Sequence, residues 1–178
     1  MENKPPHGIA VQPTRVLILM GAAGSGKTVV GRQLARDLGW SFYDGDDFQP
    51  AGNLAKMSQG LALNDQDRMP WLRALHDLIA GMLAGRGHGV VACSALKQSY
   101  RDTLKGNLGG MGWVYLKGSY ALLERRLKSR SGHFFRADLL STQFEILEEP
   151  QDAFTVDAAG DPAALSVLIR QAFRLPGP

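Results

Sequence analysis

A short apolar run, a glycine-rich loop and a helical pattern follow one another near the start of this chain, and this order constrains its fold more than any other feature. Val16–Met20 is a continuous apolar run, which is typical of a strand buried on both faces. Residues 28–38 then place apolar side chains at helical spacing. The loop between them matches the pattern G-x-x-x-x-G-K-[ST] and consists of Gly21, Ala22, Ala23, Gly24, Ser25, Gly26, Lys27 and Thr28.

This loop has the composition that a phosphate group requires. Its glycines allow backbone N–H groups to turn inward, and the following helix adds the partial positive charge of its N-terminus. The motif assigns Lys27 to the β- and γ-phosphates and the hydroxyl of Thr28 to Mg²⁺. A glycine-rich turn with an exposed lysine is the alternative, and the strand and helix on its two sides argue against it. We therefore expect the chain to bind ATP or GTP.

Strand and helix patterns alternate along the rest of the chain. This alternation predicts a three-layer α/β fold, in which helices flank a five-stranded parallel sheet and ligands bind at the carboxyl ends of the strands. Asn64 and Asp65 are candidate caps of a long helix, with Pro70 near its first turn. Ser119 is expected to cap a later helix, and Asp161-Pro162 opens the last one. The further strands are expected at residues 40–43, 89–93, 113–116 and 154–156, and the further helices at 67–84, 99–105, 119–130, 138–147 and 162–173.

Length and composition exclude several classes of protein. The 178 residues suffice for one domain or at most two, and we assign residues 1–14 to a flexible leader and 15–178 to one domain. A hydrophobic content of 44% with 21% charged residues excludes a largely disordered chain. The single cysteine, Cys93, excludes an internal disulfide and is expected to be buried. No apolar run is long enough to span a membrane and no signal sequence is evident, so we expect a cytoplasmic protein without a membrane partner.

An acidic cluster follows the second expected strand. Asp44, Asp46 and Asp47 would lie near the phosphate loop, where carboxylates can orient Mg²⁺ through water or accept a proton from an attacking hydroxyl. A solvated acidic turn or a helix cap is the alternative. The local sequence leaves both interpretations open.

Longer blocks are more specific than either of these motifs. The most particular are LNDQDRMPWL at residues 63–72 and CSALKQSYRD at 93–102. Others are DGD at 44–46, NLAKM at 53–57, YLKG at 115–118, Arg130 with HFF at 133–135, and QF at 143–144 with Glu148 and Pro150. Over residues 16 to about 157 the chain resembles the P-loop gluconokinases, which phosphorylate D-gluconate at its 6-hydroxyl. Ala62 and Gln66 stand where that family usually has proline and often has aspartate, which leaves affinity open.

The resemblance implies ATP and Mg²⁺ as cofactors, D-gluconate as acceptor and a homodimer. It implies that Asp44 lies near the metal, through water, and that Asp46 meets the acceptor hydroxyl as the catalytic base. A polyol carboxylate also needs cations, and arginine can bind both carboxylate oxygens. The substrate-binding candidates, within an acceptor region at about residues 45–72 and in two later blocks, are Asp46, Asn53, Lys56, Arg68, Lys97, Arg101 and His133. Trp71 and Tyr100 are expected to pack in the core.

Two arginines follow the fourth expected strand. Arg126 and Arg130 lie four residues apart and therefore on one face of a helix. We expect Arg126 to bind ATP, and the resemblance implies that Arg130 acts on the transferring phosphoryl group from a mobile lid at about residues 130–138. A solvated basic helix end is the alternative.

Two other functions stay open. One is a kinase of another small hydroxy acid such as shikimate, which the LNDQDRMPWL block disfavours. The other is a nucleotide-dependent binding module for nucleic acid. The net charge of +3 suits small anionic ligands, and the basic residues are dispersed rather than arranged in a stripe, so we expect no nucleic-acid partner.

Overall fold

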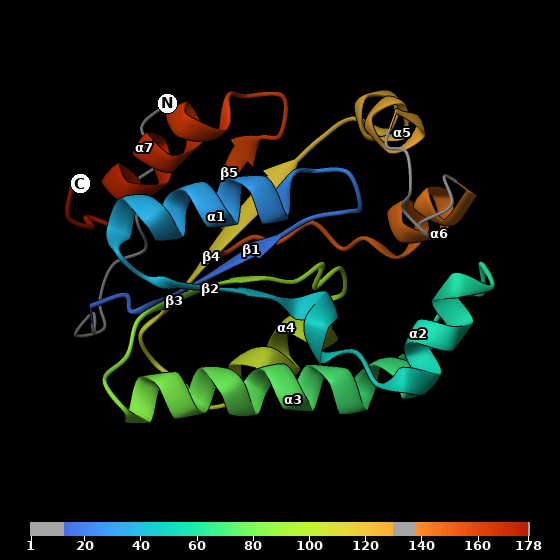
Figure 1. Cartoon of the computed structure of the whole chain (residues 1–178), viewed down its shortest axis with the longest axis horizontal. Coiled ribbons are helices and arrows are strands. Elements are labelled where there is room, and N and C mark those ends of the chain that lie inside the picture. Colours follow the sequence, from blue (N-terminus) through green and yellow to red (C-terminus); the bar gives the residue numbers. More distant parts are fainter. Residues whose placement is uncertain (1–12, 130–137, 178) are drawn as a thin grey trace.

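The computed structural model describes residues 13–129 and 138–177, and the strands of these ranges form one parallel sheet (Figure 1). The strands follow the order β2-β3-β1-β4-β5. Their bounds are Val16–Met20 (β1), Ser41–Asp44 (β2), Gly89–Ala92 (β3), Met111–Lys117 (β4) and Phe154–Asp157 (β5). Ile18 of β1 pairs in register with Val91 of β3 and Trp113 of β4, so β1 is the central strand. The predicted five-stranded parallel sheet is confirmed.

Helices connect the strands, and most lie where the sequence predicts them. Their bounds are Lys27–Leu38 (α1), Ala51–Ser58 (α2), Asp65–Ala84 (α3), Gln98–Lys105 (α4), Tyr120–Lys128 (α5), Asp138–Ile146 (α6) and Pro162–Ala172 (α7). The sequence did not predict α2 or the 3₁₀ turn η1 at Gly45–Phe48, because such short elements contain too few apolar positions to establish a period. Within the described ranges, no helix has the length and apolar character needed to cross a membrane.

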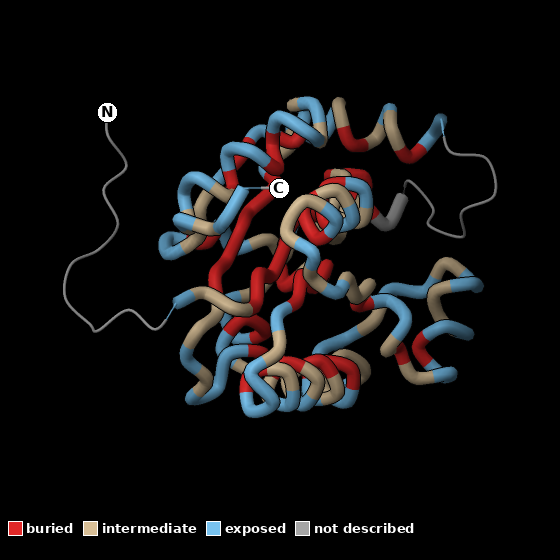
Figure 2. Tube along the Cα trace, turned by 60° about the vertical axis from the view of Figure 1, so that its left-hand side comes forward, coloured by how far each residue is buried: buried red, intermediate tan, exposed pale blue. Residues whose placement is uncertain are grey.

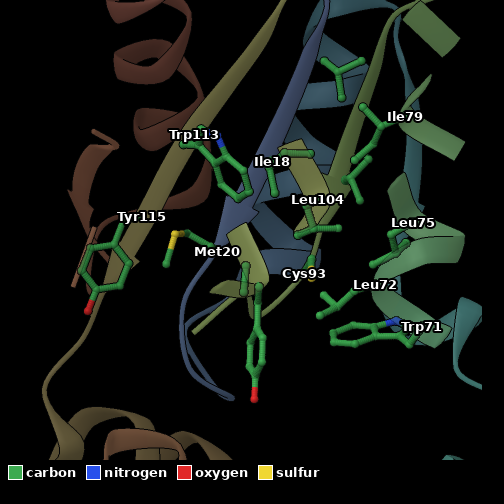
Figure 3. Close-up of a cluster of buried hydrophobic side chains, with 14 of the residues drawn as sticks. Ile18, Met20, Trp71, Leu72, Leu75, Ile79, Cys93, Leu104, Trp113 and Tyr115 are labelled. Atoms are coloured by element: carbon green, nitrogen blue, oxygen red, sulfur yellow. The ribbon is translucent and has the colours of Figure 1, made fainter. Parts of the chain in front are cut away.

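The two faces of the sheet are covered by different helices. On one face, α1 and α7 pack over Leu17 and Leu19 of β1. On the other, α3 and α4 pack over Ile18 and Met20, and Figure 3 shows Leu75 of α3 in this second cluster. Figure 2 shows the buried residues concentrated along the strands between these two layers. The alternation of β1 side chains between two apolar clusters explains why the whole strand is apolar.

Two further helices lie beside the glycine-rich loop. A third apolar cluster joins Ala22 of the loop to Leu123 and Leu127 of α5 and to Leu140 of α6, with Phe144 packed against it. The rings of Phe144 and Tyr120 meet edge to face, with their centroids 5.3 Å apart. The segment after β4 is therefore held against the loop by apolar contacts.

Side-chain caps begin three of the helices as predicted. Asn64 caps α3 in a capping box with Asp67, Ser119 caps α5, and Asp161 caps α7 with proline at the first helical position. Pro70 lies inside α3 rather than in its first turn. Because proline has no N–H group, the helix lacks one backbone hydrogen bond there.

Candidate active site

The glycine-rich loop connects the carboxyl end of β1 to α1. Gly21 has a φ of +139°, and a Cβ added to it would lie 2.7 Å from the carbonyl oxygen of Leu116 in β4. Gly24 has a φ of +81°, and a Cβ there would lie 3.0 Å from the carbonyl oxygen of Leu123 in α5. Glycine alone suits both positions, so these residues let the loop backbone run close to its neighbours. Gly26, with a φ of +95°, then caps α1, and the N-terminus of this helix favours negative charge.

Lys27 and Thr28 lie at the start of α1 and reach in two directions. The ammonium group of Lys27 donates to the carbonyl oxygens of Gly21 and Ala22, at 2.9 and 3.0 Å. The hydroxyl of Thr28 donates to Oδ2 of Asp44 at 2.9 Å, which joins α1 to the end of β2. The cation, hydroxyl and carboxylate that the sequence assigned to phosphate and metal therefore lie at one edge of the sheet.

A groove of about 300 Å³ lies along the second half of the loop. Its lining includes Gly24, Gly26, Val29, Arg126, Gly160 and Pro162. The guanidinium group of Arg126 approaches the carbonyl oxygen of Gly24, with Nη1 donating at 3.5 Å. The predicted ATP-binding arginine thus lies beside the loop, in a groove whose other wall comes from the connection between β5 and α7.

Asp46 lies in the η1 turn directly after β2. Its N–H group donates to Oδ1 of Asp44 at 3.2 Å. The residue as a whole is exposed, but desolvation by the surrounding protein raises the pKa of its carboxyl group. The positive charge of Lys27 lowers this pKa in part, and the negative charges of Asp44 and Asp47 raise it further. The influence of Lys27 places the carboxyl group within electrostatic reach of the phosphate loop. A raised pKa makes this carboxylate a better proton acceptor than an ordinary aspartate.

A charged cluster forms where α3 and α4 begin, beside an open pocket that Asp65, Lys97 and Tyr100 help to line. The ammonium group of Lys97 contacts both carboxylate oxygens of Asp65, at 2.8 and 2.9 Å, and the Tyr100 hydroxyl donates to the same carboxylate. Hydrogen bonds from Lys97 and then Tyr100, together with the charge of Arg68, lower the pKa of Asp65. The charge of Lys97 is therefore balanced within the protein. The ring of Tyr100 is buried as predicted, whereas its hydroxyl joins this cluster.

Arg68 differs from Lys97 in its partners. Its Nη2 donates to the carbonyl oxygen of Leu63 at 3.2 Å, and its guanidinium lies 5.7 Å from the centroid of the Tyr100 ring. Its buried Nε has no hydrogen-bond partner in the described part of the chain. A buried N–H group without a partner costs about 1–3 kcal/mol.

Asn53 and Lys56 join the unpredicted helix α2 to α3. The buried amide of Asn53 donates to Oε1 of Gln49 at 2.9 Å and to the carbonyl oxygen of Asp67 at 2.8 Å. The ammonium group of Lys56 lies 2.6 Å from Oδ1 of Asp67. These bonds hold α2 in place, and a contact of either residue with substrate stays a prediction.

Arg101, a predicted substrate-binding residue, has its guanidinium group bonded within the protein, and its contact with substrate stays a prediction. It is buried, and its guanidinium donates to the carbonyl oxygens of Ala95 and Leu96, at 3.0 and 3.1 Å, and to Oε1 of Gln98 at 2.7 Å. These hydrogen bonds join the loop after β3, at Ala95 and Leu96, to the first turn of α4, at Gln98. Trp71 packs in the core as expected, and its Nε1 donates to the carbonyl oxygen of Gly45 at 2.6 Å.

Some predicted features lie outside the described residues. These are Arg130, His133, nearly all of the expected lid at 130–138, and residues 1–12 of the expected leader.

Two residues at the site were assigned no functional role from the sequence. They are Asp65, considered only as a cap, and Gln143, whose Oε1 accepts from the Ala23 N–H group at 2.7 Å. The QF block at 143–144 was the available signal for Gln143.

Oxygen ligands suited to Mg²⁺ are present but few. Thr28 and Asp44 offer a hydroxyl and a carboxylate, and the buried hydroxyl of Ser25 has no partner in the described ranges. Among the residues that the structure describes, no group of three or more histidine, cysteine, aspartate and glutamate side chains could hold a metal ion. Mg²⁺ commonly keeps several waters and binds through one or two carboxylates and the substrate's phosphates. The residues fit an Mg²⁺ ion that arrives with a nucleotide.

Comparison with known proteins identifies close relatives. Residues 23–151 match the family model described as shikimate kinase. A probable gluconokinase of Xenopus tropicalis is 47% identical over 153 residues, covering 76% of this chain and 79% of the relative. The thermoresistant gluconokinase of Escherichia coli is 45% identical over 135 residues, covering 76% of this chain and 77% of the relative. The crystal structure of a gluconokinase from Sinorhizobium meliloti superposes with a TM-score of 0.80 at 40% identity, covering 91% of this chain and 92% of that one.

Proposed function

This chain belongs to the gluconokinases, within the shikimate kinase family, and from that membership we propose that it transfers the γ-phosphoryl group of ATP to the 6-hydroxyl of D-gluconate, giving 6-phospho-D-gluconate and ADP. The observation that carries the proposal is the arrangement at the ends of β1 and β2. There the phosphate loop, with Lys27, lies within electrostatic reach of a carboxylate, Asp46, which has a raised pKa. This arrangement supplies a phosphate anchor and a proton acceptor on one edge of the sheet.

The nucleotide side of the reaction uses the loop and the groove beside it. ATP use follows from membership of this kinase family. We propose that residues 21–28 hold the phosphates, that Lys27 contacts the β- and γ-phosphates, and that the groove at Arg126 and Gly160 receives the base. Thr28 and, through water, Asp44 would hold Mg²⁺, which when bound neutralises charge on the phosphates.

Asp46 is the proposed base on the acceptor side. Its carboxylate accepts the proton of the attacking hydroxyl as the new bond to phosphorus forms. Phosphoryl transfer has a loose transition state, so we expect positioning and charge stabilisation to contribute more to the rate than this proton transfer. Lys27, which lowers the pKa of Asp46 by its charge, helps to keep the carboxylate ionised.

Arg68 is the proposed partner of the gluconate carboxylate. Among the described residues no ion pair joins Arg68 to a carboxylate, and this favours it over Lys97, which already contacts Asp65. Lys97, Lys56 and Asn53 are proposed to bind hydroxyl groups of the polyol. Arg101 is proposed to position the loop after β3. Arg130 and His133 keep the roles that the family resemblance implies, the first on the transferring phosphoryl group and the second on the substrate.

A coupled ADP-release assay tests this function. Mg·ATP is supplied with gluconate, shikimate, glucose, glycerate or no acceptor. Of these acceptors, we expect only gluconate to give strong turnover. Oxidation of the product by 6-phosphogluconate dehydrogenase would identify the position of transfer. Turnover on shikimate instead of gluconate would reassign the acceptor residues. If no acceptor increased the rate of ADP release, the alternative of a nucleotide-dependent binding module would be revived.

Three expectations accompany this proposal. We propose that residues 15–178 form a single kinase domain, that two chains associate as a homodimer, and that the protein acts in the cytoplasm. Light scattering coupled to gel filtration measures the mass in solution, and about twice the 19.3 kDa of the chain is the expected result.

A further inference from the structure

One contact of the phosphate loop comes from a residue that the proposed mechanism does not use. Oε1 of Gln143, in α6, accepts from the backbone N–H group of Ala23 at 2.7 Å, across 120 residues of sequence. Backbone N–H groups of such loops are the groups that receive phosphate oxygens. A side-chain amide bonded to one of them therefore lies at the phosphate site itself.

The position of Ala23 indicates which end of the phosphate chain it adjoins. Lys27, the residue that reaches the β- and γ-phosphates, contacts the carbonyl oxygens of Gly21 and Ala22, directly before Ala23. The groove proposed for the base lies at Gly24 and Gly26, farther along the loop. Ala23 consequently lies toward the γ-phosphate end of the nucleotide.

The surroundings of Gln143 fix its backbone on both sides. Leu140 is fully buried against α5 and the loop, and Phe144 packs in the same cluster and against the ring of Tyr120. Farther along the chain, the N–H group of Glu148 donates to the carbonyl oxygen of Leu96 at 2.9 Å, and the Glu148 carboxylate accepts from the Gln98 N–H group. The chain is therefore held at the phosphate loop before Gln143, through Leu140, and at the loop after β3 beyond it, through Glu148.

From this geometry we propose that Gln143 is a γ-phosphate-binding residue, which uses its two amide atoms for different partners. Oε1 remains on the Ala23 N–H group and so holds the carboxamide in place. Nε2, on the same carbon, donates to an oxygen of the γ-phosphoryl group. This inference rests on the proposed binding of a nucleoside triphosphate by the loop and adds a group that distinguishes a triphosphate from a diphosphate.

Two substitutions separate the two halves of the amide. Gln143→Glu keeps an acceptor for the Ala23 N–H group but removes the donor and adds a negative charge next to the γ-phosphate. Gln143→Met keeps the approximate size and removes both hydrogen bonds. Gln171→Glu makes the same chemical change at an exposed position on α7 and is the matched control.

The measurement is the affinity of each variant for Mg·ADP and for the Mg complex of a non-hydrolysable ATP analogue, by calorimetry, with thermal unfolding as a check on folding. A hydrogen bond to a charged group predicts that Gln143→Glu binds the triphosphate about tenfold to a hundredfold more weakly, while its affinity for ADP and that of the control stay unchanged. Gln143→Met should lose triphosphate affinity in the same direction. Equal losses for ADP and the triphosphate, or no loss in a folded Gln143→Glu protein, would overturn the proposal. Gluconate turnover by the unmodified protein is measured separately, so failure of the acceptor assignment does not affect this readout.

Discussion

The phosphate loop and the acceptor side of this protein are built in different ways. Residues 21–28, the proposed phosphate site, are contiguous, and the backbone conformation at two glycines and the start of one helix give this segment its shape. The acceptor side is assembled from β2, α2, α3 and α4, through side-chain pairs such as Lys97 with Asp65 and Lys56 with Asp67. A charged residue in the loop thus has a role that its motif defines, whereas a charged residue on the acceptor side can be neutralised by a neighbour that the local sequence does not identify.

The largest expected effect belongs to the loop. Lys27→Ala should lower kcat by about 10³-fold or more, because the substitution removes the cation that stabilises charge on the transferring phosphoryl group. ADP release with saturating gluconate measures the rate, and circular dichroism checks that the fold is retained. Lys105→Ala, at an exposed position on α4, is the control. Near-normal turnover by Lys27→Ala would contradict the assignment of residues 21–28 as the phosphate-binding loop.

The next effect lies at the junction of the two regions. Asp46→Asn should lower kcat by about 10²–10⁴-fold through loss of the base, with little change in ATP binding. Because the pKa of Asp46 is raised, mainly by desolvation, the protonated form persists to a higher pH than for an ordinary aspartate, and kcat/KM should fall as the pH drops through this raised value. The Asp46→Asn protein should lack this acidic limb. Asp47→Asn removes one of the charges that raise the pKa of Asp46, so this variant should retain activity and show its acidic loss of kcat/KM at a lower pH. An unchanged kcat in Asp46→Asn would exclude Asp46 as the base.

A smaller effect distinguishes the cations of the acceptor side from each other. Arg68→Met should raise the KM for gluconate by about tenfold to a hundredfold, since it removes a charge-assisted bond to the carboxylate. Lys97→Met should have only a modest effect on that KM, because Lys97 already contacts Asp65. The KM for ATP is the internal control for both variants. The reverse order of effects would assign the carboxylate to Lys97 and show that its pair with Asp65 opens on binding.

The smallest effect concerns the frame of the acceptor side. Asn64→Ala removes the cap of α3 and should lower the free energy of unfolding by about 1 kcal/mol, without a large change in kcat. Urea unfolding followed by circular dichroism measures this change. The control is Asn107→Ala, at an exposed position in the turn after α4. A large loss of kcat in stable Asn64→Ala protein would instead indicate a direct contact of Asn64 with the substrate.

The sequence by itself determined the features that depend on neighbouring residues. The strand, loop and helix of residues 16–38, the succession along the chain of the five strands and of every described helix but α2, and the caps Ser119 and Asp161 were predictable, because period, glycine content and capping groups act over a few residues. The burial of Cys93 was predictable for the same reason, since it follows a continuous apolar strand; burial raises the pKa of its thiol to about 12.

Only the tertiary structure decided which polar side chains meet. The sequence presented Arg68, Lys97 and Arg101 as equivalent cations. The fold buries Arg101 of α4 against the loop after β3 and pairs Lys97 with a carboxylate 32 residues away, while the Nε of Arg68 lacks a partner in the described ranges. Likewise, Gln143 reaches the loop only because α6 packs on α5 and Ala22. The physical reason is that hydrogen bonds and ion pairs act over a few ångströms, so their partners are chosen by the packing of the helices on the sheet and not by position along the chain.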